Sequence, residues 1–372
     1  MVALLGQIPR YWLARRFRLG APLPANVTVG LTYRCNSRCQ TCRVYERQSA
    51  ELTVEEWARV FAGLGAAPYW FTFSGGEPFL RRDTPDIVRA AIVTCRPRVV
   101  NLPTNGLLTD RVVEGAAAVC AADPQTRVIV NVSLDGVGPQ HDEIRGVPGA
   151  YEKAVATVRG LQELRCANLT VGIHTVISRF NAANMERIVP QLLALGPDSY
   201  VTEVAEQRVE LGTTALDIAP DAEAYDRALD HVERALAEHL RDGVSGLIQA
   251  FRREYYARAR RYLRSGETGL PCYAGLASAQ IDPSGDVWFC CVRAESVGNV
   301  KAAGYDFRAV WRGSAAERLR DSVRRAECAC PLANAAYTNM LCHPPTIARV
   351  LWQRWVPRWF QNSKFVACAS RA

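Results

Sequence analysis

Three cysteines near the start of the chain have a spacing that fits one compact metal centre. Cys35, Cys39 and Cys42 lie in the segment CNSRCQTC. Structural zinc and a fully ligated four-iron cluster each take four protein ligands, one more than this segment supplies. The spacing alone leaves two interpretations open. One is a four-iron cluster with one iron open to a small molecule, and the other is zinc with a distant fourth ligand.

A second group of cysteines lies in the last hundred residues. It comprises Cys272, Cys290, Cys291, Cys328, Cys330 and Cys342. Residues 283–285 read Pro-Ser-Gly, a natural hairpin turn, so we expect Cys272 and Cys290 to meet across two strands. Adjacent strand residues point to opposite faces, so we expect Cys291 to point away from Cys290 and not to act with it. The sequence alone does not assign a role to Cys328, Cys330 and Cys342. A zinc knuckle is the alternative interpretation of this group.

The pattern of apolar residues predicts the elements that position these cysteines. Short β-branched runs alternate with amphipathic stretches of helix length, which predicts a parallel α/β architecture. The expected strands are residues 27–32, 70–73, 98–102, 127–134, 169–177 and 199–204. The expected helices lie near residues 53–64, 84–94, 110–121, 151–164 and 183–195, followed by a helical stretch at 220–263. Thr53 and Glu56 have the spacing of a capping box. From Cys272 onward the sequence predicts short strands and turns.

Further motifs stand at the ends of the second, third and fourth expected strands or follow them. They are Ser74-Gly75-Gly76-Glu77-Pro78, Thr104-Asn105-Gly106, Val132-Ser133-Leu134-Asp135-Gly136 and His141-Asp142-Glu143-Ile144-Arg145-Gly146. Ligand sites of parallel barrels gather at this rim. In this order after the first three cysteines, the motifs resemble the radical S-adenosylmethionine (SAM) superfamily over roughly residues 25–205. The resemblance implies an α/β fold, a partial (β/α)6 TIM-type barrel.

The resemblance also implies a role for each motif. The first three cysteines would hold a [4Fe-4S] cluster whose open iron chelates SAM. The residues implied to bind or frame SAM are Gly75, Gly76, Glu77, Asn105, Ser133, Asp135 and Arg145. Ser133 and Arg145 match positions that bind the methionine carboxylate, a task suited to a guanidinium. Asp135 either orders its turn or contacts the ribose, and Asn105 either lines the pocket or caps a turn. Thr41 departs from the hydrophobic residue that is usual before the third cysteine.

The C-terminal region resembles the SPASM/Twitch extension of radical SAM enzymes. Cys272, twelve residues, Gly285, four residues and Cys290 match its first half. The second half lacks most of the later cysteines of a full SPASM set, so we expect one auxiliary [4Fe-4S] cluster. Its candidate ligands are Cys272, Cys290, Cys328, Cys330 and Cys342.

The implied activity is reductive cleavage of SAM to a 5′-deoxyadenosyl radical, which abstracts hydrogen from an unidentified substrate. The expected outcome is oxidation or maturation of a peptide or natural-product-type substrate. The implied partners are SAM, that substrate and a low-potential electron donor of ferredoxin or flavodoxin type. The alternatives are radical modification of a lipid or sugar at a membrane surface, and a non-catalytic zinc-binding protein.

Composition excludes several other classes. The chain is 49% hydrophobic, which excludes long disorder, and no apolar run reaches the roughly 18 residues of a membrane span. The net charge of +8 rests on an arginine bias, so nucleic-acid binding is not expected. The N-terminus lacks the order of features found in signal peptides, which predicts a cytoplasmic protein. The basic aromatic segments 8–19 and 347–360 either pack on the barrel or contact the inner membrane surface.

Composition changes and motifs divide the chain into five parts. They are a basic amphipathic segment (1–24), the radical SAM core barrel (25–205), a helical bridge (206–268), the auxiliary iron–sulfur domain (269–345) and a basic aromatic tail (346–372).

Overall fold

The computed structural model describes residues 2–239 and 245–355. Six parallel strands form the first part of a curved sheet, which confirms the expected α/β fold. They are β1 (Asn26–Thr32), β2 (Trp70–Gly75), β3 (Val99–Thr104), β4 (Arg127–Ser133), β5 (Leu169–Ile177) and β6 (Ser199–Val204). Each strand pairs in parallel with the next one in sequence.

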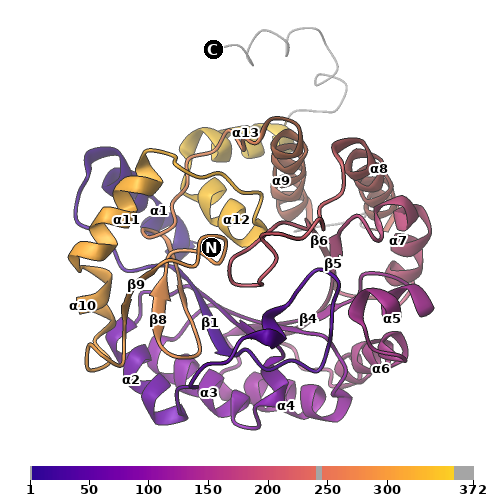
Figure 1. Ribbon diagram of the computed structural model, residues 1–372, viewed down its shortest axis with the longest axis horizontal. Helices are drawn as coiled ribbons and strands as arrows, with labels where there is room; N and C mark the ends of the chain where they lie inside the picture. Colours follow the sequence, from indigo (N-terminus) through magenta and orange to yellow (C-terminus); the bar gives the residue numbers. More distant parts are fainter. Residues whose placement is uncertain (1, 240–244, 356–372) are drawn as a thin grey trace, which may run out of the picture.

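Helices connect these strands and cover one side of the sheet (Figure 1). They are α2 (Val54–Leu64), α3 (Thr84–Cys95), α4 (Thr109–Ala122), α5 (Pro139–Arg145), α6 (Ala150–Glu163) and α7 (Met185–Leu193). The capping box at the start of α2 is present, with Thr53 and Glu56 bonded reciprocally. Helix α5 was not expected from the sequence, because its seven residues are too few for a helical period to show.

The two faces of the sheet differ in polarity. In β3 and β4, alternate residues such as Val100 and Val130 are fully buried in the main hydrophobic core. The residues between them are half-buried and polar: Asn131 donates to Asn101 (2.8 Å), and Asn101 donates to Thr72 (3.5 Å). A parallel sheet covered on both faces carries near-continuous apolar runs. The alternation observed here therefore leaves a polar inner face.

The C-terminal strands extend the same sheet instead of forming a separate one. Strands β7 (Ser278–Ile281), β8 (Asp286–Trp288) and β9 (Ser296–Asn299) follow β1 in the sheet order. Strand β7 pairs in parallel with β1, from Asn26 opposite Ser278 to Val29 opposite Ile281. The β7–β8 pair is antiparallel, as the predicted hairpin requires. The division into five parts stays a prediction, and strands of two of those parts share one sheet.

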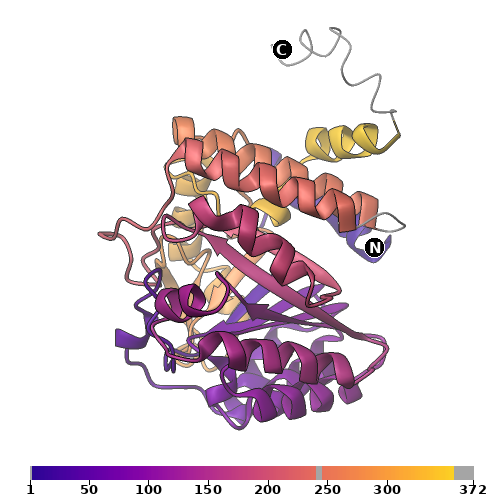
Figure 2. The same ribbon diagram turned by 90° about the vertical axis from the view of Figure 1, so that its right-hand side faces the viewer.

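The remaining helices include the predicted stretch after β6 and several that the sequence did not predict. The helical stretch after β6 consists of α8 (Ala222–His239) and α9 (Ser245–Ser265). Helix α9 lies on the side of the sheet opposite to α3 and α4 (Figures 1 and 2). Past the expected strands, the tail is largely helical, with α10 (Phe307–Trp311), α11 (Ser314–Arg324), α12 (Ala333–Leu341) and α13 (Pro344–Trp355). The expectation of strands and turns throughout this tail was therefore wrong, because its cysteines and short apolar runs hid the helical period.

The N-terminal helix α1 (Val2–Phe17) packs on the protein with one face. Tyr11 is buried and donates its hydroxyl hydrogen to Leu23 O (2.8 Å). Phe17 and Leu19 are exposed, and so is Trp352 on α13. Trp359 and Phe360, which belong to the basic aromatic segment 347–360, lie outside the described residues. No helix of the described ranges is both long and apolar enough to cross a membrane.

Candidate functional site

The first three cysteines lie on a loop that follows β1 and is held between the end of β2 and the end of helix α5. On one side, the N–H groups of Gly76 and Glu77 donate to Thr32 O (2.7 Å) and Arg34 O (2.9 Å). On the other side, the N–H groups of Arg38 and Gln40 donate to the carbonyls of residues 145 (2.9 Å) and 144 (2.9 Å). Main-chain hydrogen bonds from two of the predicted motifs therefore fix the cysteine loop (residues 33–43).

Glycine is required where these segments meet. A Cβ on Gly75 would lie 2.1 Å from Thr32 O, and a Cβ on Gly76 would lie 2.2 Å from Arg34 O. Gly75 also has a φ of +138°, which other residues rarely adopt. In this structure the two glycines serve the close approach of β2 to the cysteine loop, and both line the cavity described below.

Hydrogen-bond donors surround the three sulfur atoms. The N–H groups of Ser37 and Val44 donate to Sγ of Cys35 (3.4 Å) and of Cys42 (3.4 Å). Arg145 Nη1 donates to Cys39 Sγ (3.7 Å). Burial raises the pKa of Cys35 and raises that of Cys42 to about 12. These thiols therefore ionise at neutral pH only against a cation such as iron, and the donors then stabilise the thiolates.

Glu77 braces the end of β3 and does not line the cavity. Its carboxylate accepts hydrogen bonds from Thr104 Oγ1 (2.9 Å), Phe79 N (3.2 Å) and Asn105 N (2.7 Å). Only 1% of Glu77 is exposed, and burial raises its pKa to about 7. Asn105 connects the end of β3 to the cysteine loop, because its Nδ2 donates to Asn36 Oδ1 (2.7 Å) and Ser37 Oγ (3.0 Å).

Asp135 and Arg145 form a buried ion pair beside Cys39. Arg145 Nη2 lies 2.8 Å from Asp135 Oδ2, and the other carboxylate oxygen accepts from Val176 N (2.8 Å). Arg145 Nε is buried and has no partner among the described residues. His141 Nδ1 accepts from Asp135 N (3.1 Å), and burial lowers the His141 pKa to about 3. The neutral imidazole therefore orders the turn that carries the ion pair.

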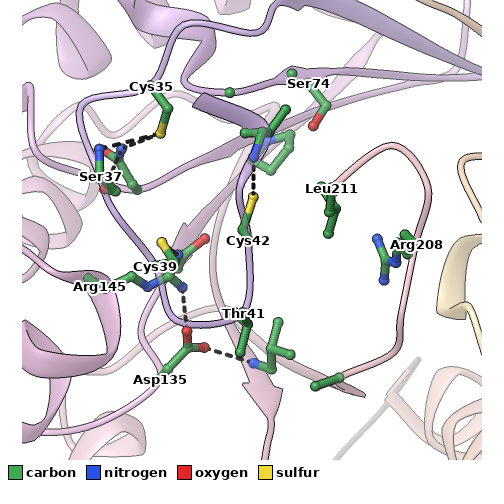
Figure 3. A pocket seen from close by; sticks show the side chains of 18 of the residues that line it. Cys35, Ser37, Cys39, Thr41, Cys42, Ser74, Asp135, Arg145, Arg208 and Leu211 are labelled. Carbon is green, nitrogen blue, oxygen red and sulfur yellow. Dashed lines mark hydrogen bonds and ion pairs between the residues drawn. The ribbon is translucent and has the colours of Figure 1, made fainter. Parts of the chain in front are cut away.

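A cavity of ≈ 190 Å³ opens beside these residues (Figure 3). One wall carries the three cysteines with Gly75, Gly76, Asn105, Ser133, Asp135 and Arg145. Sequence reasoning brought all nine residues to one site, and the structure places them together. The opposite wall carries Glu203, Glu206, Arg208 and Leu211, which sequence reasoning missed. The signal that points to them is their place at and just after β6, at the same rim as the other motifs.

Glu206 and Arg208 bring charge into the cavity wall. Arg208 Nε donates to Glu206 Oε1 (3.1 Å), and Arg208 Nη2 donates to Glu203 Oε1 (3.4 Å). Burial raises the Glu206 pKa to about 7, although Arg208 acts to lower it. A carboxyl group with this pKa exchanges protons near neutrality, which suits it to hold or release a substrate proton.

Four cysteines of the second group act on each other electrostatically. Cys328 raises the pKa of Cys272 and of Cys290, while Cys272 and Cys290 raise that of Cys330. Burial is the largest cause of the raised pKa in Cys272, Cys290 and Cys330. As at the first site, buried thiols of this kind favour a cationic metal group as their partner.

Cys342 and Cys291 differ from these four cysteines in being buried. Cys342 is 3% exposed in the main core, and burial alone raises its pKa to about 12. Cys291 is also buried, packs against Leu332 and faces the charges of Arg208 and Glu210. Within the described residues, no three His, Cys, Asp or Glu side chains are placed to hold a single metal ion.

Two family models match this chain, one over the region of the first three cysteines and one over the region of the second group. A family model described as the radical SAM superfamily matches residues 29–190. A second, described as an iron–sulfur cluster-binding domain (SPASM), matches residues 272–331.

Two curated relatives match over most of the chain. The PqqA peptide cyclase of Granulibacter bethesdensis is 30% identical over 68% of this chain and 68% of its own length. The mycofactocin maturase MftC of Mycobacterium tuberculosis is 29% identical over 86% of this chain and 78% of its own.

Solved structures share the fold. SuiB of Streptococcus suis, bound to its precursor peptide SuiA, has a TM-score of 0.62 at 16% identity and covers 91% of this chain and 77% of its own. The enzyme anSMEcpe, with bound SAM and a peptide, has a TM-score of 0.59 at 13% identity and covers 89% of this chain and 99% of its own.

Proposed function

This chain belongs to the radical SAM superfamily, and on that premise we propose that it matures a peptide by hydrogen abstraction. Membership makes it an enzyme that uses SAM with a [4Fe-4S] cluster, and the SPASM match adds iron–sulfur binding in the C-terminal region. It also decides against the zinc-binding, non-catalytic alternative. The residues that perform each task and the substrate belong to the proposal.

Cys35, Cys39 and Cys42 would hold the SAM cluster. The observation that carries this assignment is the cysteine loop itself, which two SAM motifs fix by main-chain hydrogen bonds and which opens into the same cavity as Ser133 and Arg145. When bound, the cluster and SAM supply a 5′-deoxyadenosyl radical that abstracts hydrogen from the substrate. The protein orients SAM and keeps water from the cavity.

Arg145 would have two tasks at this site. Its Nη1 and Nη2 each make one contact, to Cys39 and Asp135, so the second N–H of each remains for the SAM carboxylate. A guanidinium that touches both a cluster sulfur and SAM would hold the two in a fixed relation. Asp135 keeps this guanidinium in place and does not itself need to contact the ribose.

The auxiliary [4Fe-4S] cluster would be held by four thiols. The mutual electrostatic effects of Cys272, Cys290, Cys328 and Cys330 support this set. The burial of Cys342 argues against it as a ligand, because the other four cysteines are partly exposed. A full set of four protein ligands leaves no iron open, so this cluster would serve electron transfer or structure and not substrate chelation.

Relatives are named both for a peptide (PqqA peptide cyclase) and for heme synthesis (AdoMet-dependent heme synthase), and we propose the peptide. PqqA peptide cyclase and the complex of SuiB with its precursor peptide support this choice, because both are named for a peptide. In this chain, the polar inner face of the sheet and the charged wall at Glu206 and Arg208 suit a polar, hydrogen-bonding substrate. A test with peptides would distinguish a peptide substrate from a natural-product, sugar or lipid substrate.

Two measurements test the proposal in order. The first is iron per chain after anaerobic reconstitution, for wild type and for a variant with all three cysteines of the first loop changed to alanine. Two four-iron clusters predict about eight irons in the wild type and about four in the variant. A fall from about four irons to none would remove the auxiliary cluster from the proposal.

The second measurement concerns the substrate. Peptides encoded beside the gene would be co-expressed with the enzyme and weighed by mass spectrometry. A peptide that loses hydrogen only in the presence of intact Cys35 would support maturation. No change in any such peptide, together with 5′-deoxyadenosine release stimulated by a lipid or sugar extract, would refute it. Reduced flavodoxin or ferredoxin should replace dithionite in this assay if a low-potential protein donates the electron.

Contact with a membrane surface is a separate part of the proposal. Phe17 is 57% exposed and Leu19 is 54% exposed, and both neighbour Arg16 and Arg18. Exposed apolar side chains beside arginines suit an anionic lipid interface, and the expected location is then cytoplasmic and peripheral. Co-sedimentation with phosphatidylglycerol vesicles should fall in the Phe17→Ser variant. If the variant sedimented with the vesicles as much as the wild type did, or if the wild type did not sediment with them, the membrane contact would be refuted.

A further inference from the structure

Residues 205–213, here called the strap, lie between the two groups of cysteines. On one side, Arg43 N donates to Leu211 O (2.8 Å), next to the last cysteine of the first loop. On the other side, the N–H groups of Val209 and Glu210 donate to Val292 O (3.1 Å) and Cys291 O (3.2 Å). The main chain of the strap is therefore bonded to both metal-binding regions.

The strap is also a wall of the SAM cavity. Glu206, Arg208 and Leu211 line the cavity opposite the cysteine loop, and Figure 3 shows Arg208 and Leu211 on the side away from Cys39. The Glu206–Arg208 bond described above holds this wall together. One short segment thus lines the SAM cavity and is bonded to both metal-binding regions.

Arg47 connects the strap to both sites with its side chain. Its guanidinium lies 4.3 Å from the ring centroid of Tyr33 and 5.6 Å from that of Trp288. Its Nη1 donates to Glu210 O (3.1 Å). Tyr33 belongs to the cysteine loop, while Trp288 ends β8, close in sequence to Cys290. Arg47 therefore touches the cysteine loop, the strap and the segment that leads to the auxiliary site.

We propose that the strap couples the two metal sites: ligation at Cys290 fixes the segment that holds the strap, and the strap fixes the outer wall of the SAM cavity. Arg47 is the positioning residue of this connection. The inference rests on the proposed function, since it needs a metal group bound by Cys290 and SAM bound in the cavity. Coupling between binding sites is reciprocal, so each site then stabilises the other by the same factor.

The first experiment removes the connection without touching a cysteine. In the Arg47→Leu variant we expect unchanged iron per chain, faster hydrogen exchange of the strap amides, and a SAM dissociation constant at least about 5-fold higher by equilibrium dialysis. Arg59→Leu is the matched control, because Arg59 lies 3.9 Å from the Tyr305 ring centroid and donates to Gly304 O (3.3 Å), away from the strap. Unchanged exchange and SAM affinity in Arg47→Leu would overturn the proposal.

The second experiment is a double-variant cycle. Cys290→Ala should lose the auxiliary iron and also weaken SAM binding at least about 5-fold. In the Arg47→Leu background, the same cysteine change should weaken SAM binding much less, because the connection is already broken. Equal effects in both backgrounds would refute coupling through Arg47.

The iron counts separate the two proposals. If Cys290→Ala loses about four irons and SAM affinity stays at the wild-type value, the coupling fails and the proposed function stands. If this variant keeps all its iron, the ligand set of the proposed function is wrong, and the coupling falls with it. Hydrogen exchange of the strap amides is also compared between Arg47→Leu and wild type in the iron-free protein, where neither cluster contributes. Faster exchange in the variant is again the expected result.

Discussion

Changing Gly76 to alanine tests whether close backbone approach holds the cysteine loop. A Cβ at this position would lie 2.2 Å from Arg34 O and 2.7 Å from Tyr33 O. Gly76 is not among the glycines with positive φ, so the strain would come from space alone. Both neighbouring atoms belong to the main chain and cannot rotate away, so the strand end and the loop must separate.

The structure gives the size of the effect. Separation breaks the hydrogen bonds from Gly76 N to Thr32 O (2.7 Å) and from Glu77 N to Arg34 O (2.9 Å). Two such bonds contribute about 1 kcal/mol each and overpacking adds about 1–3 kcal/mol, so the free energy of unfolding should fall by about 3–5 kcal/mol. That loss is a large part of the stability of an ordinary domain.

The assay is urea unfolding followed by circular dichroism, together with iron per chain after reconstitution. Gly20→Ala is the matched control, because a Cβ on Gly20 meets nothing within 4 Å. The control should stay within about 0.5 kcal/mol of wild type and keep its iron. If the free energy of unfolding of Gly76→Ala lies within about 1 kcal/mol of the wild-type value and the variant keeps the first cluster, close backbone approach does not hold the loop.

Three more predictions follow from the buried groups. Cys328→Ala should lose about four irons per chain, whereas Cys342→Ala should lose none; equal losses would contradict their separation. Burial raises the Glu77 pKa from 4.5 to about 7. Its stabilising contribution is therefore complete below pH 4.5 and is lost as the pH rises through about 7. Glu77→Gln should flatten the fall in unfolding free energy between about pH 5 and about pH 8, and an unchanged slope would refute this. Arg145→Gln should cost about 3–5 kcal/mol by leaving Asp135 buried without its cation. Adding Asp135→Asn should recover most of that loss in urea unfolding, and no recovery would show that the pair is not the cause.

Local patterns in the sequence predicted the barrel and the SAM wall of the site. Each strand of the core is followed by its helix, and the motifs stand at strand ends, so neighbours in sequence are neighbours in space. The capping box at Thr53 and the turn at residues 283–285 are also local, and both are present.

Long-range contacts explain what the sequence did not predict. Nothing in residues 278–281 indicates that they pair with β1, because a four-residue strand carries little pattern. The same holds for the choice among the late cysteines: Cys342 is buried and Cys328 is half-buried, and the burial of one cysteine depends on the whole fold. The strap has no periodic pattern, and its partners lie at Arg43, Arg47 and Cys291.

The pairing of β1 with β7 has a consequence for how the protein is made. Strand β1 leaves the ribosome early, but its partner on one side is translated about 250 residues later. At about 5–20 residues per second, that edge of the nascent chain stays unpaired for roughly 12–50 s. An exposed strand edge is a template for aggregation. The yield of soluble protein in a foreign host should therefore depend on chaperones that shield nascent chains, before iron delivery becomes limiting.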